Sequence, residues 1–266
     1  MCQRKLVVVL LCLQRLMATL SFPLVESVRQ RPSCHRASAS AGDDTITIVG
    51  YGSLLSERSS RLTFPKLQNF RLGRIKDYRR VFAHPASIFF QRAIANLETL
   101  EMSSLSAEHD PGNDGFVVSL FEVSTEGMLD DGVPSQAYLE REEEFDIVRV
   151  RAVDVEGFEC HGFLCAKSTD DAYIERWGKE HFEEHYHKYG VDSIWGWSRD
   201  SGLLPCAVYL RHCYLAAKSM GDECLDSFLD DTYLVDRTTT IREYMQANPH
   251  VLDCTPPPEL AIRYSG

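Results

Sequence analysis

The segment Thr45–Leu55, TITIVGYGSLL, decides how the rest of the chain is interpreted. Its first five residues, Thr45–Val49, are all β-branched, a composition that favours a pleated and largely buried strand. Two glycines, Gly50 and Gly52, follow directly and flank Tyr51. Because glycine has no Cβ, it can adopt positive φ or let the backbone approach another group closely. The segment therefore predicts a buried strand that ends in a tight, glycine-rich turn.

This turn does not match two common functional motifs that begin in the same way. It is not a dinucleotide-binding fingerprint, because Leu55 stands where the third glycine would be. It is not a nucleophile elbow, because Ser53 does not lie inside G-x-S-x-G. Successive backbone N–H groups in such a turn can converge on one oxyanion or carboxylate. The local sequence leaves open the alternative of a strand that ends in a turn without a ligand.

The first 42 of the 266 residues differ in composition from the rest. Arg4 and Lys5 precede the apolar run Leu6–Leu13, which is too short to span a bilayer and resembles a secretory signal. The remainder of this segment is rich in Arg and Ser and nearly free of acid, which is typical of a transit peptide. We therefore expect a targeting leader over residues 1–42 and a single domain over residues 43–266. The combination favours a plastid reached through the secretory route, with a mitochondrion, secretion or a disordered N-terminus without an address as alternatives.

The predicted domain is strongly acidic. Residues 1–42 hold six basic residues and one glutamate, +5 in all, against −11 for the whole chain, so residues 43–266 carry −16. Such a charge argues against nucleic acid or an anionic membrane as a partner, and we expect no stable membrane insertion of the mature domain. A domain of about 220 residues can bury a core without disulfide bonds. We expect its six cysteines to be reduced and mostly structural: Cys160, Cys165, Cys206, Cys213, Cys224 and Cys254.

The order of the periodic segments predicts an α+β fold, because strands come first and helices follow. Strands are expected over residues 45–49, 93–100, 115–123, 145–155 and 157–167, with a strand or hairpin over 70–84. Helices are expected over residues 136–144, 169–187, 205–220, 222–229 and 238–247, and a polar loop over 103–114. The connections between neighbouring strands are too short for β-α-β crossovers. We therefore expect a small, mostly antiparallel or mixed β-barrel with flanking helices.

A run of acidic residues, Glu140–Glu144, lies between Leu139 and the predicted strand that starts at Phe145. Four carboxylates in five residues usually form a solvated face of the protein. In the alternative, one of them turns inward, where loss of water raises its pKa and lets it serve as general base and acid.

The glycine-rich turn and the acidic run together resemble the γ-glutamyl cyclotransferase-like superfamily, which includes the ChaC-type enzymes. Gly50–Leu54 is similar to the family's YGS turn, and Leu139–Phe145 lies on its Leu-Asp-x-x-Glu-Gly segment. Two positions depart from the family pattern, because Glu140 replaces Asp and Glu144 replaces Gly. The resemblance extends over roughly residues 45–245, including the helices near the C-terminus.

Two alignments of the acidic run give two candidates for the family's catalytic glutamate. Alignment on Leu139 places it at Glu143, which is the preferred choice from the sequence. Many members carry Arg directly before this glutamate, and alignment on Arg141 places it at Glu142. Both residues are therefore candidates for the acid/base.

The resemblance implies a metal-independent γ-glutamylcyclotransferase that needs no cofactor and acts on a small-molecule γ-glutamyl substrate. The substrate's own α-amine attacks its γ-carbonyl, which closes the ring of 5-oxoproline and expels an amine or amino acid. One buried carboxylate, Glu143 or Glu142, would carry the proton between the two nitrogens. Backbone N–H groups of the turn would hold the α-carboxylate or the developing oxyanion: those of Tyr51, Gly52, Ser53 and Leu54.

Two other functions are compatible with parts of the sequence. His181, Glu184 and His185 match H-x-x-E-H, the zinc-binding pattern of one class of peptidases, in a predicted helix. Surface or helix-packing histidines are the ordinary interpretation of such a short match. The second alternative is a non-catalytic binding module with the same fold, which the replacement of glycine by Glu144 would allow.

Overall fold

The computed structural model describes residues 45–266. The predicted leader over residues 1–42, its cleavage and its cellular destination lie outside these described residues. In the described part of the chain, no helix combines the length and the apolar composition that crossing a membrane requires.

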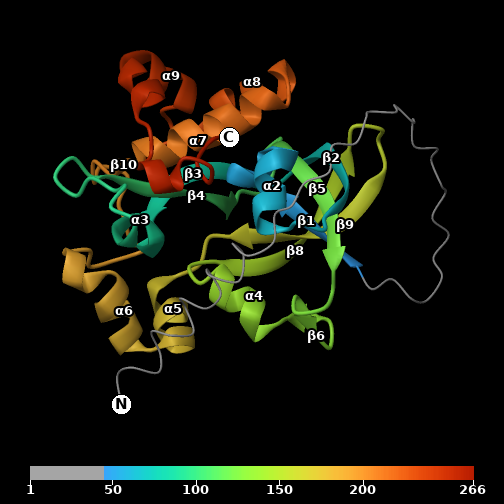
Figure 1. Cartoon of the computed structure of the whole chain (residues 1–266), viewed down its shortest axis with the longest axis horizontal. Coiled ribbons are helices and arrows are strands. Elements are labelled where there is room, and N and C mark those ends of the chain that lie inside the picture. Colours follow the sequence, from blue (N-terminus) through green and yellow to red (C-terminus); the bar gives the residue numbers. More distant parts are fainter. Residues whose placement is uncertain (1–44) are drawn as a thin grey trace. The chain divides into compact units, whose positions relative to one another are not determined.

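Five strands close into a small barrel, which confirms the predicted α+β fold (Figure 1). In their order around the barrel they are β1 (Thr45–Gly50), β5 (Phe116–Ser124), β2 (Gln68–Ile75), β8 (Asp146–Asp154) and β9 (Glu159–Ala166). Neighbours in this order are antiparallel, and a parallel contact between Ile48 and Phe163 joins β9 back to β1. The predicted hairpin of residues 145–167 is the pair β8 and β9.

The sheet continues beyond the barrel, and two predictions made for this region are wrong. Strand β4 (Glu101–His109) pairs with β9 and with β3 (Tyr78–Pro85), although residues 103–114 were expected to form a polar loop. Its serines are buried, and Ser103 Oγ donates a hydrogen bond to Leu204 O at 2.9 Å. Residues 93–100, expected as a strand, form none: Asn96 makes an isolated bridge to Glu101, and residues 97–100 form a turn.

The two strands found within residues 70–84 do not form a hairpin with each other. Strand β2 pairs with β5 and β8, whereas β3 pairs with β4 and β11 (Thr232–Tyr233). Strand β10 (Leu204–Pro205) adds to β4, and β6 (Leu129–Asp130) and β7 (Val133–Pro134) form a separate short pair.

Helices flank the sheet on two sides. Figure 1 shows α7 (Ala207–Ser219), α8 (Asp222–Asp230) and α9 (Ile241–Ala247) on one side of the strands. On the other side lie α4 (Gln136–Arg141), α5 (Asp170–Trp177) and α6 (Lys179–His185). The single helix expected over residues 169–187 is broken at Gly178, whose φ is +88°.

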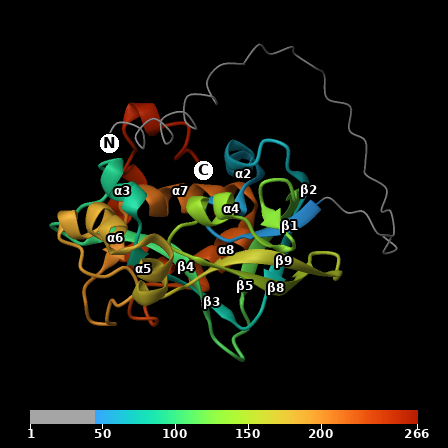
Figure 2. The ribbon, with the colours of Figure 1, turned by 90° about the horizontal axis from the view of Figure 1, so that it is seen from below.

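The remaining helical elements are short. They are α2 (Glu57–Thr63), α3 (Ser87–Gln91) and the 3₁₀ segments η2 (Ser53–Leu55), η3 (His187–Tyr189), η4 (Pro249–Asp253) and η5 (Pro258–Leu260). A second view shows α3, α5 and α6 gathered at one end of the domain and β1, β2 and β9 at the other (Figure 2).

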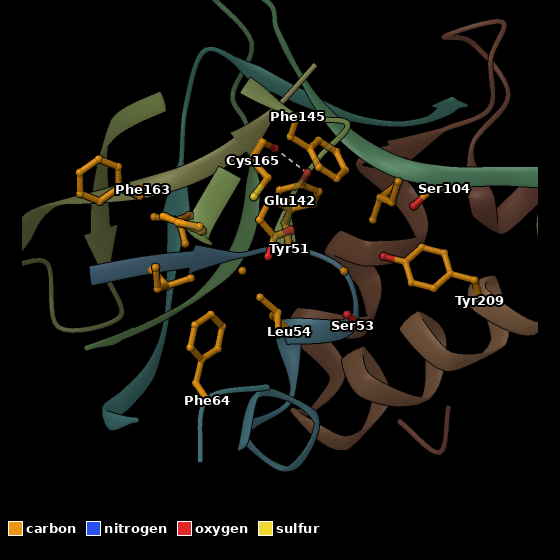
Figure 3. Close-up of a pocket in the computed structure, with 16 residues that line it drawn as sticks. Tyr51, Ser53, Leu54, Phe64, Ser104, Glu142, Phe145, Phe163, Cys165 and Tyr209 are labelled. Carbon is orange, nitrogen blue, oxygen red and sulfur yellow. Dashed lines mark hydrogen bonds between the residues drawn. The ribbon is translucent and has the colours of Figure 1, made fainter. Parts of the chain in front are cut away.

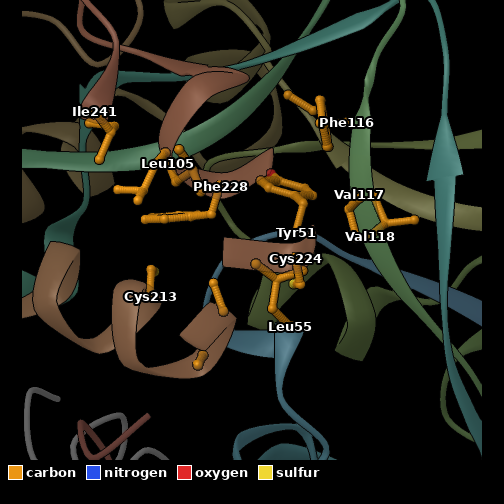
Figure 4. Packing of buried hydrophobic residues seen from close by; sticks show 14 of the residues in the cluster. Tyr51, Leu55, Leu105, Phe116, Val117, Val118, Cys213, Cys224, Phe228 and Ile241 are labelled. Carbon is orange, nitrogen blue, oxygen red and sulfur yellow. The ribbon is translucent and has the colours of Figure 1, made fainter. Parts of the chain in front are cut away.

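The largest core cluster fixes the turn after β1 (Figure 4). Tyr51 and Leu55 pack there among side chains of β5 and α8, including Phe116 and Phe228. The rings of Tyr51 and Phe116 meet edge to face, with centroids 6.1 Å apart. A second cluster holds α5 and α6 against Trp195, next to the segment that follows α4. The two segments singled out in the sequence are therefore both anchored by apolar packing.

Candidate active site

The turn after β1 needs its glycines because other groups approach them closely. A Cβ on Gly50 would lie 2.5 Å from Ser119 Oγ, and one on Gly52 would lie 2.9 Å from Tyr209 Oη. Neither glycine has positive φ. Of the two roles that glycine can play in a turn, close approach is the one observed.

The carbonyl groups of this turn are hydrogen-bonded by buried side chains, whereas several of its N–H groups are not bonded. Tyr51 O accepts a hydrogen bond from Arg80 Nη1 at 3.3 Å, and Leu54 O accepts one from Ser119 Oγ at 2.7 Å. Within residues 45–266, the amide N–H groups of Gly52–Leu54 have no hydrogen-bond acceptor. Such unpaired donors on successive residues are the feature of an anion-binding nest.

The residues of this turn line a cavity of about 110 Å³ (Figure 3). Phe64 and Phe163 lie at one end of it, and the hydroxyl groups of Ser104 and Tyr209 lie at the other. Glu142 lines the cavity between these two ends. Pockets for drug-sized ligands usually exceed about 300 Å³, so this cavity suits a compact ligand with both polar and apolar surfaces.

The end of helix α4 directs Glu142 toward the cavity. Ser135 caps the start of the helix, which ends at Arg141, and the N–H of Glu142 still bonds the last turn. Burial raises the pKa of Glu142, partly offset by Arg141, whose Nε lies 3.2 Å from Glu142 Oε1, and by the polar thiol group of Cys165. A carboxyl group with a raised pKa accepts a proton more readily than an ordinary carboxylate and can return it to a second group.

Glu143, the preferred catalytic candidate from the sequence, does not line this cavity. Its carboxylate accepts hydrogen bonds from Ser87 Oγ at 2.8 Å and from His181 Nε2 at 3.2 Å. Burial alone would raise the pKa of Glu143, but the hydrogen bonds from His181 and Ser87 outweigh it and lower the pKa. Of the two alignments, the one on Arg141 places a carboxylate in the cavity.

Glu144, which departs from the glycine of the pattern described above, is buried and does not line the cavity. Its Oε1 accepts hydrogen bonds from Tyr186 Oη at 2.7 Å and from Ser87 N at 3.1 Å. Burial, followed by the nearby charge of Glu143, raises the pKa of Glu144 to about 7. The side chain therefore does not obstruct the cavity.

The zinc-binding pattern does not assemble into a metal site. The rings of His181 and His185 stack 3.9 Å apart, but His181 faces Glu143 and Nδ1 of His185 donates to His181 O. Glu184 is exposed. Within residues 45–266, no group of three or more His, Cys, Asp or Glu side chains is placed to hold a metal ion.

Sequence reasoning missed several residues of the cavity wall. Ser104 lies in the segment that was expected to be a loop, and Tyr209 reaches the turn from helix α7. Cys165 comes from β9. The short turn after residues 145–155 predicts a partner strand here, but only the closed barrel brings this strand beside the end of α4.

Comparison with known proteins gives similarities of structure only. No protein-family model and no curated protein matches the sequence. Three similar solved structures are an uncharacterised human protein, a gamma-glutamyl cyclotransferase and a protein of Arabidopsis thaliana. The human protein is 15% identical, with 47% of this chain and 68% of that chain covered and a TM-score of 0.35. The cyclotransferase is 15% identical, with 46% of this chain and 68% of that chain covered and a TM-score of 0.33. The Arabidopsis protein is 13% identical, with 57% of this chain and 93% of that chain covered and a TM-score of 0.29.

Proposed function

We propose that this protein is a γ-glutamyl cyclotransferase-type enzyme that releases 5-oxoproline from a small γ-glutamyl compound. One observation carries the proposal: Glu142 and the turn residues Gly52–Leu54, whose N–H groups have no acceptor among residues 45–266, line the same small cavity. A proton carrier and an anion cradle are the two groups that this reaction requires of the protein.

The reaction needs little else, because the substrate contains both reacting groups. The free α-amine attacks the γ-carbonyl carbon, and a new C–N bond closes the five-membered ring. The bond from this carbon to the leaving nitrogen then breaks, which gives 5-oxoproline and an amine. Holding the two groups in line can replace much of the entropic barrier, since effective molarities for such closures are on the order of 10⁵ M or more.

Glu142 would move the proton that this exchange of bonds displaces. As the ring closes, its carboxylate takes a proton from the attacking nitrogen, and it then returns the proton to the leaving nitrogen. General acid–base catalysis of this kind contributes roughly 10²–10⁴-fold in rate. The raised pKa of Glu142 supports this role, because a proton bound more tightly is taken up more readily.

The Gly52–Leu54 donors would bind the substrate's α-carboxylate or the oxyanion that develops on the γ-carbonyl. Both are negative charges that backbone N–H groups stabilise strongly in a site with little water. The apolar end of the cavity, at Phe64 and Phe163, would exclude water from the reacting groups.

The test is a panel of γ-glutamyl compounds scored for 5-oxoproline by the wild-type protein and by Glu142→Gln. We expect release from at least one compound by the wild type and its loss in the variant. The same ligand should still bind to the variant, because glutamine keeps the shape of the side chain. If the wild-type protein binds one of these compounds but releases 5-oxoproline from none of them, the result would favour the binding module.

A further inference from the structure

Arg80 is fully buried in the strand β3, directly behind the glycine-rich turn. Its Nη1 donates to Tyr51 O and to Val117 O, each at 3.3 Å, and its Nη2 donates to Ser227 O at 2.5 Å. The guanidinium lies over the ring of Phe116, 4.6 Å from the centroid. Every oxygen that it contacts is an uncharged backbone or hydroxyl oxygen.

This arginine has no anionic partner in direct contact. Among residues 45–266, no carboxylate forms an ion pair with Arg80, and its Nε has no hydrogen-bond acceptor. Of the carboxylates, that of Asp231 raises the pKa of Arg80 most, but it contacts Ser227 Oγ rather than the guanidinium. Burial lowers the pKa of Arg80 to about 10, so the side chain still carries its charge at neutral pH. A buried charge without a counter-charge in direct contact is costly and calls for an explanation.

The position of Arg80 relative to the cavity suggests what supplies the missing charge. Tyr51 O, which accepts from Arg80, belongs to the same peptide group as the N–H of Gly52. That N–H is one of the unpaired donors of the turn, and Gly52 lines the cavity. A hydrogen bond from a cation to the carbonyl polarises the peptide and makes its N–H a stronger donor.

We propose that Arg80 is a positioning residue whose counter-charge is the carboxylate of the ligand in the cavity, reached through the Tyr51–Gly52 peptide group. The carboxylate's identity, that of a γ-glutamyl substrate or 5-oxoproline, rests on the proposed function. The inference that the cavity prefers an anion to a neutral molecule of the same shape is independent of the proposed function.

Two ligands of nearly equal shape test this preference by calorimetry. The probes are 5-oxoproline and 2-pyrrolidinone, which is the same ring without the carboxylate. The proteins are the wild type, Arg80→Met, Arg80→Lys and Asp231→Asn. We expect the wild type to bind 5-oxoproline more tightly, and Arg80→Met to lose this advantage by about tenfold to hundredfold, as for two charges roughly 8 Å apart, on either side of one peptide group, at an effective dielectric constant of about 20. Arg80→Lys should recover part of it, and the affinity for 2-pyrrolidinone should stay nearly constant.

The Asp231→Asn variant protects the test against damage to the fold. Asp231 is half-exposed, and asparagine can still accept from Ser227 Oγ, so we expect this variant to fold. Because it removes the main opposing charge near Arg80, it should bind 5-oxoproline more tightly, about twofold, and structural damage would not produce this gain. The proposal is wrong if the wild type binds both ligands equally, if Arg80→Met keeps the preference, or if Asp231→Asn weakens the binding of 5-oxoproline.

The result also separates this inference from the proposed function. If the wild-type protein prefers the carboxylate ligand but releases no 5-oxoproline from any γ-glutamyl compound, the result supports the role of Arg80 and contradicts the proposed enzymatic function. If the wild-type protein turns over its substrate and Arg80→Met leaves KM unchanged, the result supports the enzymatic function and contradicts the role of Arg80.

Discussion

Glu142 and Glu143 are adjacent in the sequence, but their carboxyl groups lie in different surroundings after the end of α4. Glu142 lines the cavity beside the glycine-rich turn, and Glu143 contacts Ser87 and His181. The two environments move their pKa values in opposite directions, up for Glu142 and down for Glu143. Substitutions at these two positions should therefore have separate effects.

Glutamine at the two positions should distinguish the roles by rate. Glu142→Gln should lower kcat for 5-oxoproline release by roughly 10²–10⁴-fold, the contribution of a general acid–base. Glu143→Gln leaves the Glu142 carboxyl group in the cavity, and we expect kcat to change by less than about tenfold. The reverse order of effects would show that the first alignment of the acidic run was the right one.

The pH dependence of stability should report on Glu144. A carboxyl group with its pKa raised from 4.5 to about 7 binds its proton more tightly in the native state, so the free energy of unfolding falls as pH rises through this window. The loss should be on the order of 3 kcal/mol and be complete above pH ~7. Glu144→Gln keeps an acceptor for Tyr186 and should be more stable than the wild type at pH ~8, with little difference near pH ~4. Urea unfolding at several pH values measures this, and the exposed Glu140→Gln is the control. A difference that did not depend on pH would contradict the assignment.

The contact between Gly52 and Tyr209 should appear as coupling between two substitutions. A Cβ on Gly52 would lie 2.9 Å from Tyr209 Oη and 3.3 Å from Leu105 Cδ2, so Gly52→Ala should cost about 1–3 kcal/mol and raise KM. Tyr209→Phe removes the hydroxyl group that the new methyl group meets. In the double variant, part of the lost stability should return, and a double-mutant cycle by thermal unfolding measures the coupling. Simple additivity would show that the two groups do not meet.

Cys165 should lower the pKa of Glu142 without itself reacting with the substrate. Burial, then the charge of Glu142, raises the pKa of this thiol well above its usual range, so it is not a ready nucleophile. The polar thiol group lowers the pKa of Glu142, so Cys165→Ala should shift the acid limb of the kcat profile to higher pH. The plateau value of kcat should change only a few-fold. Loss of activity at every pH, together with a covalent adduct on the wild-type thiol, would contradict this expectation.

The sequence predicted those elements in which one physical signal dominated. The β-branched run before Gly50 became β1. The alternating residues of 145–155 became β8, which forms the expected hairpin with β9. Strand β4 was missed because Ser103, Ser104 and Ser106 are buried in it. Buried serines bond to neighbouring backbone, as Ser106 does to Val81 O, and this compensation cannot be recognised from a polar sequence alone.

The site was predicted in its two segments but not in its details. The turn and the acidic run were both identified, yet the choice between Glu142 and Glu143 depends on where α4 ends, and this is uncertain by a residue in any sequence-based assignment. The role of Arg80 could not be foreseen, because an arginine in a strand is ordinarily assigned to the solvent. Its burial depends on Ser227 and Phe228, which come from the far end of the chain.

Two of the chain's three tryptophans hold the backbone that carries Glu142. Trp177 Nε1 donates to Glu143 O at 2.9 Å, and Trp195 Nε1 donates to Glu144 O at 3.1 Å. The protein therefore contains its own optical probe, because a shift of this segment when a ligand enters the cavity would alter the surroundings of both indoles. Emission spectra of the unlabelled protein can follow occupancy of the cavity in real time, even for compounds that are bound but never converted.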